Sequence, residues 1–246
     1  MPIKLWRADE RPDLLAGAEA LTAASYPPFM LHDPVSARYW EALYTAPLAR
    51  FQTIAELDGQ VIAQGNAIPF MWRAGEELPN DGWDAVLEAG VEATRAGLET
   101  NALSALSIVI APNHRGAGLA EQMLGAMKQA ANHAGLTALV APVRPTRKAD
   151  YPLQDFERYC GWTRGDGTPF DPWIRTHWRL GASIVKTAPC SMRIPGNISA
   201  WQQWTGLTFP ESGLYGFAGG LAPLVVDIDR DEAVYTEPNL WMRHLL

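Results

Sequence analysis

The pattern of apolar and polar residues along the chain changes between two periods. Apolar residues at every second position predict strands, and apolar residues three and four apart predict helices. The expected strands cover 3–8, a hairpin over 51–70 with its turn at Asp58-Gly59, 103–111, 137–143, 183–194, and a closing hairpin of 221–228 and 233–242. The expected helices cover 12–26, 34–47, 84–97, 118–134, 155–162, 173–182 and 198–206. This mixture of elements predicts a mixed α/β fold.

The most regular part of the chain is a strand, a glycine-containing loop, a helix and a second strand. The strand 103–111 alternates cleanly, and the helix 118–134 carries Leu119, Met123 and Met127 on one apolar stripe. A β-loop-α-β unit of this length normally places its two strands in parallel, with a right-handed crossover. We therefore expect one parallel pair inside the sheet.

Composition limits the class of protein. The 246 residues are 48% apolar, and they show no internal repeat or linker, so we expect a single domain over 1–246. The net charge of −7 argues against a nucleic-acid surface. No run approaches the ~20 apolar residues of a membrane span, and the N-terminus does not resemble a signal peptide. Two cysteines form no disulfide framework, and five histidines show no metal-ligand spacing. We expect a cytoplasmic protein without a metal, a membrane anchor or a nucleic-acid partner.

The loop APNHRGAGLAEQML (111–124) carries the candidate chemistry. A Walker A loop is excluded because Leu-Ala-Glu follows Gly118, and a dinucleotide fingerprint fails because Glu121 occupies the third glycine position. The run from Arg115 to Ala120 instead reads [RQ]-x-x-G-x-[GA], between a strand and a helix. With this motif the chain resembles the GNAT superfamily of acyl-CoA N-acyltransferases.

The resemblance implies a fold. It is a central, mixed and mostly antiparallel sheet, flanked by helices, in which one parallel pair of strands splays apart at a bulge. The core would cover about 3–186, and 187–246 would be a C-terminal extension that completes the sheet. Whether the extension also completes the acceptor pocket or forms a homodimer face is left open.

The resemblance also implies an acetyl-CoA site. The loop would hold the pyrophosphate on unsatisfied N–H groups at the start of a helix, and small residues would let the backbone approach the phosphates. The splayed strand would pair with the pantetheine arm, and the amide of Val109 or Ile110 would donate to the oxyanion. The residues assigned to acetyl-CoA are Ile108, Val109, Ile110, His114, Arg115, Gly116, Ala117, Gly118, Leu119 and Ala120.

At the position of the general acid, the chain departs from the family pattern. Many family members have a Tyr four residues before a Gly, whereas RTHWRLGAS (175–183) has His177 at that place. A histidine can donate this proton and ordinarily titrates near neutrality, and the alternative is a histidine packed on a tryptophan-rich face. Weaker candidates are Tyr151 and Tyr159 as acids, and Glu99 and Ser107 as bases. We expect the two cysteines, Cys160 and Cys190, to be structural.

The acceptor wall is expected to be aromatic. Its candidates are Trp40, Tyr44, Trp72 and the tryptophans between 162 and 204; the acidic residues Asp227, Asp229, Asp231 and Glu232 either attract a cation or mark a solvated hairpin. The resulting hypothesis is an acetyl-CoA-dependent N-acetyltransferase that acts on a primary amine of a small molecule or a peptide. The alternative is a non-catalytic acyl-CoA-binding sensor, which the missing Tyr makes plausible.

Overall fold

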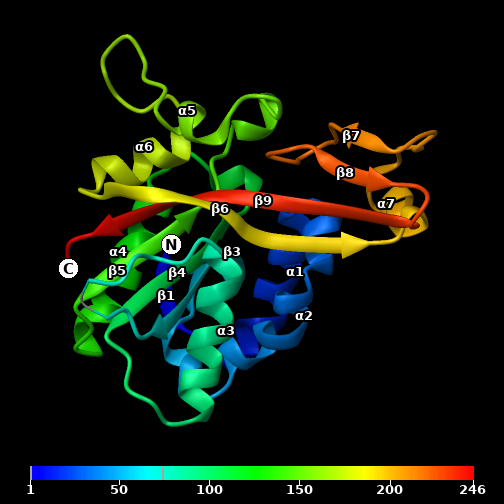
Figure 1. Cartoon of the computed structure of the whole chain (residues 1–246). Helices are drawn as coiled ribbons and strands as arrows, with labels where there is room; N and C mark the ends of the chain where they lie inside the picture. The colour runs from blue at the N-terminus through cyan, green and yellow to red at the C-terminus, as the bar shows by residue number, and fades with distance from the viewer. Residues whose placement is uncertain (1, 74) are drawn as a thin grey trace.

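The computed structural model describes residues 2–73 and 75–246. Over these residues the chain forms a nine-stranded sheet in the order β1-β2-β3-β4-β5-β9-β8-β7, with β6 paired to β9 (Figure 1). The strands are β1 (Lys4–Arg7), β2 (Thr53–Leu57), β3 (Gln60–Phe70), β4 (Ala102–Ile110), β5 (Ala138–Val143), β6 (Ser183–Gly196), β7 (Gly213–Tyr215), β8 (Leu224–Asp227) and β9 (Glu232–His244). The α-helices are α1 (Leu15–Ser25), α2 (Pro34–Tyr39), α3 (Gly82–Arg95), α4 (Leu119–His133), α5 (Phe156–Cys160), α6 (Pro172–Arg179) and α7 (Ile198–Thr205).

The sheet is antiparallel except for one pair. β4 and β5 run in parallel, and α4 connects them as the crossover helix. All other neighbours, from β1–β2 to β7–β8, pair in the antiparallel sense. The expected fold class, a mostly antiparallel sheet with flanking helices and one parallel pair, is confirmed.

Helices pack closely on the strands because small residues make room. Gly90 of α3 lies directly on β3, where an added Cβ would collide with the Ile68 side chain and the Pro69 carbonyl. Gly65 of β3 similarly leaves space for the side chains of Met123 and Met127 from α4. The apolar stripe predicted for this helix is therefore the face that it buries against the sheet.

Some element boundaries differ from the sequence predictions. The helix expected over 34–47 ends as an α-helix at Tyr39 and continues as a 3₁₀ helix, Trp40–Tyr44. The reason is tertiary packing, because Trp40 stacks on Trp83 and contacts Tyr44 edge-on. The hairpin turn is confirmed, with Asp58 and Gly59 both at positive φ. The short strand β7 was not predicted.

The C-terminal part of the chain is built into the sheet. β9 lies between β5 and β8 and also pairs with β6 along most of its length. Trp201 and Trp241 are fully buried in the main hydrophobic core, together with residues from the first half of the chain. In Figure 1 the hairpin β7–β8 extends away from the rest of the sheet, beside α7.

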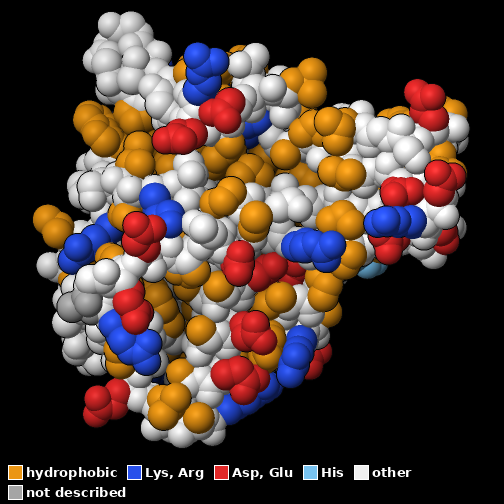
Figure 2. Space-filling view, viewed as in Figure 1, with side chains coloured by type: hydrophobic (Ala, Val, Ile, Leu, Met, Phe, Trp, Pro, Cys, Tyr) orange, Lys and Arg blue, Asp and Glu red, His pale blue; other side chains and the backbone are white. Residues whose placement is uncertain are grey.

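The surface is mixed in charge. On the face seen in Figure 2, Lys and Arg side chains are interspersed with Asp and Glu. Within the described part of the chain, no helix is both long and apolar enough to cross a membrane.

Candidate functional site

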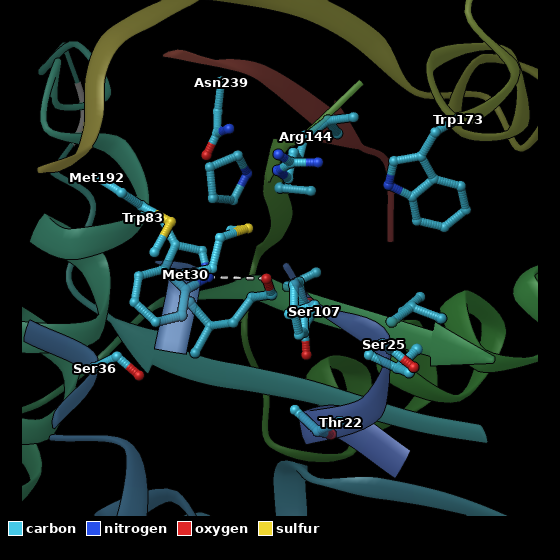
Figure 3. A pocket seen from close by; sticks show the side chains of 18 of the residues that line it. Thr22, Ser25, Met30, Ser36, Trp83, Ser107, Arg144, Trp173, Met192 and Asn239 are labelled. Atoms are coloured by element: carbon cyan, nitrogen blue, oxygen red, sulfur yellow. Dashed lines mark hydrogen bonds between the residues drawn. The ribbon is translucent and has the colours of Figure 1, made fainter. Parts of the chain in front are cut away.

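A cavity of about 690 Å³ opens where β4 and β5 separate (Figure 3). Its walls come from the C-terminal end of α1, the start of α2, α3, β4, the first turns of α4, the end of β5, α6, and the strands β6 and β9. The chain segments that meet here are far apart in the sequence, so the cavity is a product of the topology. Carboxyl ends of neighbouring parallel strands are a common place for ligands.

The separation of the two strands begins after Ser104. Parallel pairing covers only three residues on each strand, from Ala102–Ala138 to Ser104–Val140. The register between β3 and β4 shifts so that Asn66 faces Ser107 while Ala67 faces Ala105, which leaves Leu106 as an extra residue in a bulge. Residues 105–110 of β4 and 141–143 of β5 then line the cavity from opposite sides.

The bulge is held by an indole. Nε1 of Trp83 donates a hydrogen bond of 2.9 Å to the carbonyl of Leu106, drawn as the dashed line in Figure 3. The Ser107 hydroxyl donates to Asn66 Oδ1 at 3.0 Å. The first contact pairs a backbone carbonyl that the bulge leaves out of the strand ladder, and the second joins the side chains of β4 and β3 beside it.

The glycine loop ends in a helix terminus with free donors. Gly116 and Gly118 have φ of 80° and 74°, and Gly118 is the N-cap of α4 without a side-chain cap. No capping side chain therefore occupies the N–H groups of the first turn, which carry the positive end of the helix dipole. This arrangement suits an anion such as a phosphate.

The structure distributes the residues assigned to acetyl-CoA over two environments. Ile108, Val109, Ile110, Arg115 and Ala120 line the cavity. His114, Gly116, Ala117, Gly118 and Leu119 belong to the loop and helix start outside that lining, and the Leu119 side chain is buried in a core cluster with Met123. Arg115 donates from Nε to the Ile110 carbonyl at 3.1 Å, which ties the loop to the end of β4.

His177, on α6, lines the cavity, but its pKa differs from the near-neutral value expected from the sequence. The side chain is 1% exposed, its Nδ1 lies 2.9 Å from Nε2 of His244, and Trp173 packs edge-on against it. Burial, with a smaller contribution from His244, lowers the pKa of His177 to about 3. The ring is therefore neutral at physiological pH. Its Nε2 has no hydrogen-bond partner among the residues that the structure describes.

The start of α6 is fixed by one buried carboxylate. Asp171 caps the helix by accepting from the amides of Trp173 and Ile174. It also accepts from the amides of Thr146 and Arg147, just after β5. The segment that follows β5 and the helix that carries His177 are thereby held together.

The other predicted acids, bases and thiols lie away from the cavity, except Ser107. Tyr159 is buried and donates to Asp171, and Tyr151 packs among aromatic rings. Glu99 is exposed before β4. Burial raises the pKa of the Cys160 thiol to about 12, and Cys190 is exposed. Among the predicted aromatic wall, Trp40 and Trp173 line the cavity, whereas Tyr44 and Trp72 do not.

Two carboxyls at the starts of α2 and α3, the buried Asp33 and the half-buried Asp84, were missed by sequence reasoning. Asp33 caps α2 and lies fully buried, and burial raises its pKa to about 6. Burial, followed by the charge of Asp33, raises the pKa of Asp84 to about 8. One oxygen of each carboxyl has no partner within the described residues. Nothing in the local pattern distinguishes these aspartates from ordinary helix-start residues.

An arginine and a glutamate in the cavity wall were also missed. Arg144 directly follows β5, and Glu237 lies on β9; Nε of Arg144 donates to both Glu237 oxygens, at 2.9 and 3.0 Å. The available signal was position, because Arg144 is the first residue beyond a parallel strand that adjoins the glycine loop unit. No group of three or more potential metal ligands occurs among the described residues.

Comparisons with known proteins agree with this geometry. The profile of the acetyltransferase (GNAT) family matches residues 16–162. The arginine N-acetyltransferase avaD of Aspergillus versicolor is 34% identical, over 98% of this chain and 93% of its own length. The chain therefore belongs to the GNAT acetyltransferase family, and it is an N-acetyltransferase.

Solved structures share the fold at low identity. The loading GNATL domain of CurA from Lyngbya majuscula superposes with a TM-score of 0.64 at 17% identity, covering 100% of this chain and 98% of its own. The GphF GNAT-like decarboxylase, in complex with isobutyryl-CoA, superposes with a TM-score of 0.56 at 18% identity, covering 100% and 99%. These similarities establish the architecture only.

Proposed function

We propose that this enzyme transfers the acetyl group of acetyl-CoA to the amine of arginine or a closely related small molecule. The full-length similarity to an arginine N-acetyltransferase carries this proposal. The cavity supports it, because Trp40 and Trp83 stack at a centroid distance of 5.9 Å on one wall and the carboxylate of Glu41 lies on the same lining. Aromatic faces and a carboxylate are the groups that bind a guanidinium or an ammonium.

The proposed place for acetyl-CoA follows the splayed strand. The pyrophosphate would bind the backbone from His114 to Ala120 at the start of α4, and the pantetheine would pair with Ile108, Val109 and Ile110. The positive φ of the two loop glycines and the uncapped helix support this assignment. The thioester would then lie beside the bulge, within reach of the aromatic wall.

The proposed chemistry is direct transfer. The neutral amine attacks the thioester carbon, the amide of Val109 or Ile110 donates to the oxyanion, and the C–S bond breaks as the new C–N bond forms. The amine loses one proton and the departing sulfur gains one, so the products are an acetamide and the free thiol of coenzyme A. His177, in the neutral form of its ring, is proposed to donate a hydrogen bond from Nε2 to that sulfur, and the proton that the sulfur gains is the one that the amine loses.

We further propose that the whole chain, 1–246, acts as one acyltransferase domain in the cytoplasm. Its last third supplies Met192, Glu237 and Asn239 to the cavity lining, which supports a shared role in acceptor binding. Both cysteines are free thiols, which supports a reducing compartment.

Release of free thiol from acetyl-CoA, measured over a panel of amines, tests the function. Arginine and its analogues are expected to give the highest kcat/KM in the panel. Turnover of unrelated amines alone would contradict the acceptor class. Binding of acetyl-CoA without turnover of any amine would favour the alternative, a non-catalytic acyl-CoA sensor.

A further inference from the structure

Arg144 is a charged side chain that the acetyl-CoA site does not use. It follows the last residue of β5 and lines the cavity with its side chain one quarter exposed (Figure 3). A guanidinium is always charged in proteins, and it must have partners for its five N–H donors when it is removed from bulk water.

One edge of the guanidinium is fully occupied. Nε donates to both oxygens of Glu237, and Nη2 donates to the carbonyl of Gly219 at 2.5 Å. Glu237 is itself 1% exposed and also accepts from the hydroxyl of Tyr235 at 3.0 Å and from Asn239 Nδ2 at 3.4 Å. Arg144 is therefore held in one orientation by groups that are themselves fixed.

The outer edge of the guanidinium is free. No residue that the structure describes accepts a hydrogen bond from Nη1, or a second one from Nη2. Because Glu237 contacts only Nε, the paired Nη1 and Nη2 donors remain available for a bidentate contact with a planar oxygen group. A rigid, partly desolvated group of this kind loses little entropy when a ligand binds.

Arg144 shares the cavity lining with the bulge of β4. The cavity is bounded at the bulge by Leu106 and Ser107, and at the end of β5 by Val143 and Arg144. Tyr26, Ser107 and Arg144 all line the cavity. A ligand group bound to Arg144 would thus be close to the position proposed for the thioester.

We propose that Arg144 binds the carboxyl or carbonyl oxygens next to the acceptor amine, so that the enzyme selects amino acids or their derivatives over simple alkylamines. In an α-amino acid the amine and the carboxyl group share one carbon, so a carboxyl group on Arg144 keeps the amine near the bulge. Glu237 balances the charge of Arg144, which allows either a carboxylate or an uncharged carbonyl to bind. This inference rests on the proposed function and names the recognition group within the same site.

The test compares acceptors that differ only at the carboxyl group. With the wild-type enzyme, kcat/KM for L-arginine is expected to exceed that for agmatine, which lacks the carboxylate, by about 10- to 100-fold. L-Argininamide distinguishes a carboxylate from an uncharged carbonyl as the group that Arg144 binds. Its kcat/KM resembles that of arginine if a carbonyl is sufficient, and that of agmatine if the negative charge is required. In the variant Arg144→Lys, which keeps the charge beside Glu237 but loses the paired donors, the preference for arginine over agmatine is expected to disappear.

A matched control and a binding measurement complete the design. Arg147→Lys makes the same exchange three residues away, at an arginine that pairs with Asp150 on the surface, and should keep the wild-type preference. The affinities of N-acetyl-L-arginine and N-acetylagmatine for the enzyme–coenzyme A complex, measured by calorimetry, should differ in the same direction as the kinetics. Equal use of arginine and agmatine by the wild type would overturn the role of Arg144 while leaving the proposed function intact. Equal affinities of the two products would overturn it as well, and this result does not depend on whether Arg144→Lys folds.

Discussion

At the scale of single residues, burial changes what a side chain can do. His177 stands where the sequence motif predicts a proton donor, and it lines the cavity, yet the fold surrounds it with Trp173, His244 and the core. An imidazolium ion is unfavourable there because its charge would lose hydration without gaining a counter-ion. A histidine in this environment can contribute a fixed hydrogen bond, but not a proton that titrates near neutrality.

Replacement of His177 by Ala tests this role. We expect kcat to fall on the order of 10²-fold, with a much smaller change in the KM for acetyl-CoA. Because the pKa of His177 lies near 3, its protonation does not change between pH 6 and pH 9. The ratio of wild-type to variant kcat should therefore be the same at both pH values. A ratio that changes with a midpoint near pH 6.5 would contradict the neutral form, and an unchanged kcat would remove His177 from the reaction.

At the scale of elements, the unit from β4 to β5 combines two features that neither strand has alone. The bulge at Leu106 and the short parallel pairing expose strand backbone to the cavity, and the loop glycines start α4 without a cap. The strand, the two glycines in a turn and the helix were predicted from local sequence, whereas the splaying of the strands at a bulge was predicted only from the resemblance to the family. Their use by acetyl-CoA remains a prediction.

The variant Gly118→Glu tests the loop. A carboxylate at the N-cap would occupy the free amides and repel a phosphate, so we expect loss of coenzyme A binding, measured by calorimetry. Positive φ adds a strain of about 1–2 kcal/mol for a non-glycine residue. Gly135→Glu is the control, because Gly135 follows the other end of α4 at a φ of 71° and a Cβ there meets nothing within 4 Å. Equal coenzyme A affinity in the two variants would show that the loop does not hold the phosphates.

At the scale of the whole molecule, the last 60 residues complete the sheet. β9 covers the edge of β5, pairs with both β6 and β8, and brings Trp241 into the core. Without it, β5 would present unpaired backbone to solvent, and much of the apolar core would be open. The sequence suggested a core followed by an extension. In the fold the two parts share one sheet and one hydrophobic core, so they are separate along the chain but not in their packing.

Truncation tests whether the chain acts as one unit. We expect a chain ending at residue 186 to lack a cooperative thermal transition in circular dichroism, because it loses the strand that pairs with β5. Removal of only Leu245 and Leu246, which follow β9, should leave the transition nearly unchanged. A cooperative transition in the shorter chain would instead support an independently folding core.

The sequence by itself determined whatever depends on neighbours along the chain. Apolar periodicity located nearly all helices and strands, Asp58-Gly59 specified a hairpin turn, and the Arg115–Ala120 motif identified the family. Local preference is sufficient for these features because the interacting groups are a few residues apart.

Only the tertiary structure decided which distant groups meet. Arg144 contacts Glu237 across 93 residues and His177 contacts His244 across 67, and both contacts depend on β9 lying beside β5 and β6. Strand order and register arise from packing of the whole sheet, which no local pattern encodes. The same packing determines burial, so the protonation of His177 and the available donors of Arg144 could be known only from the fold.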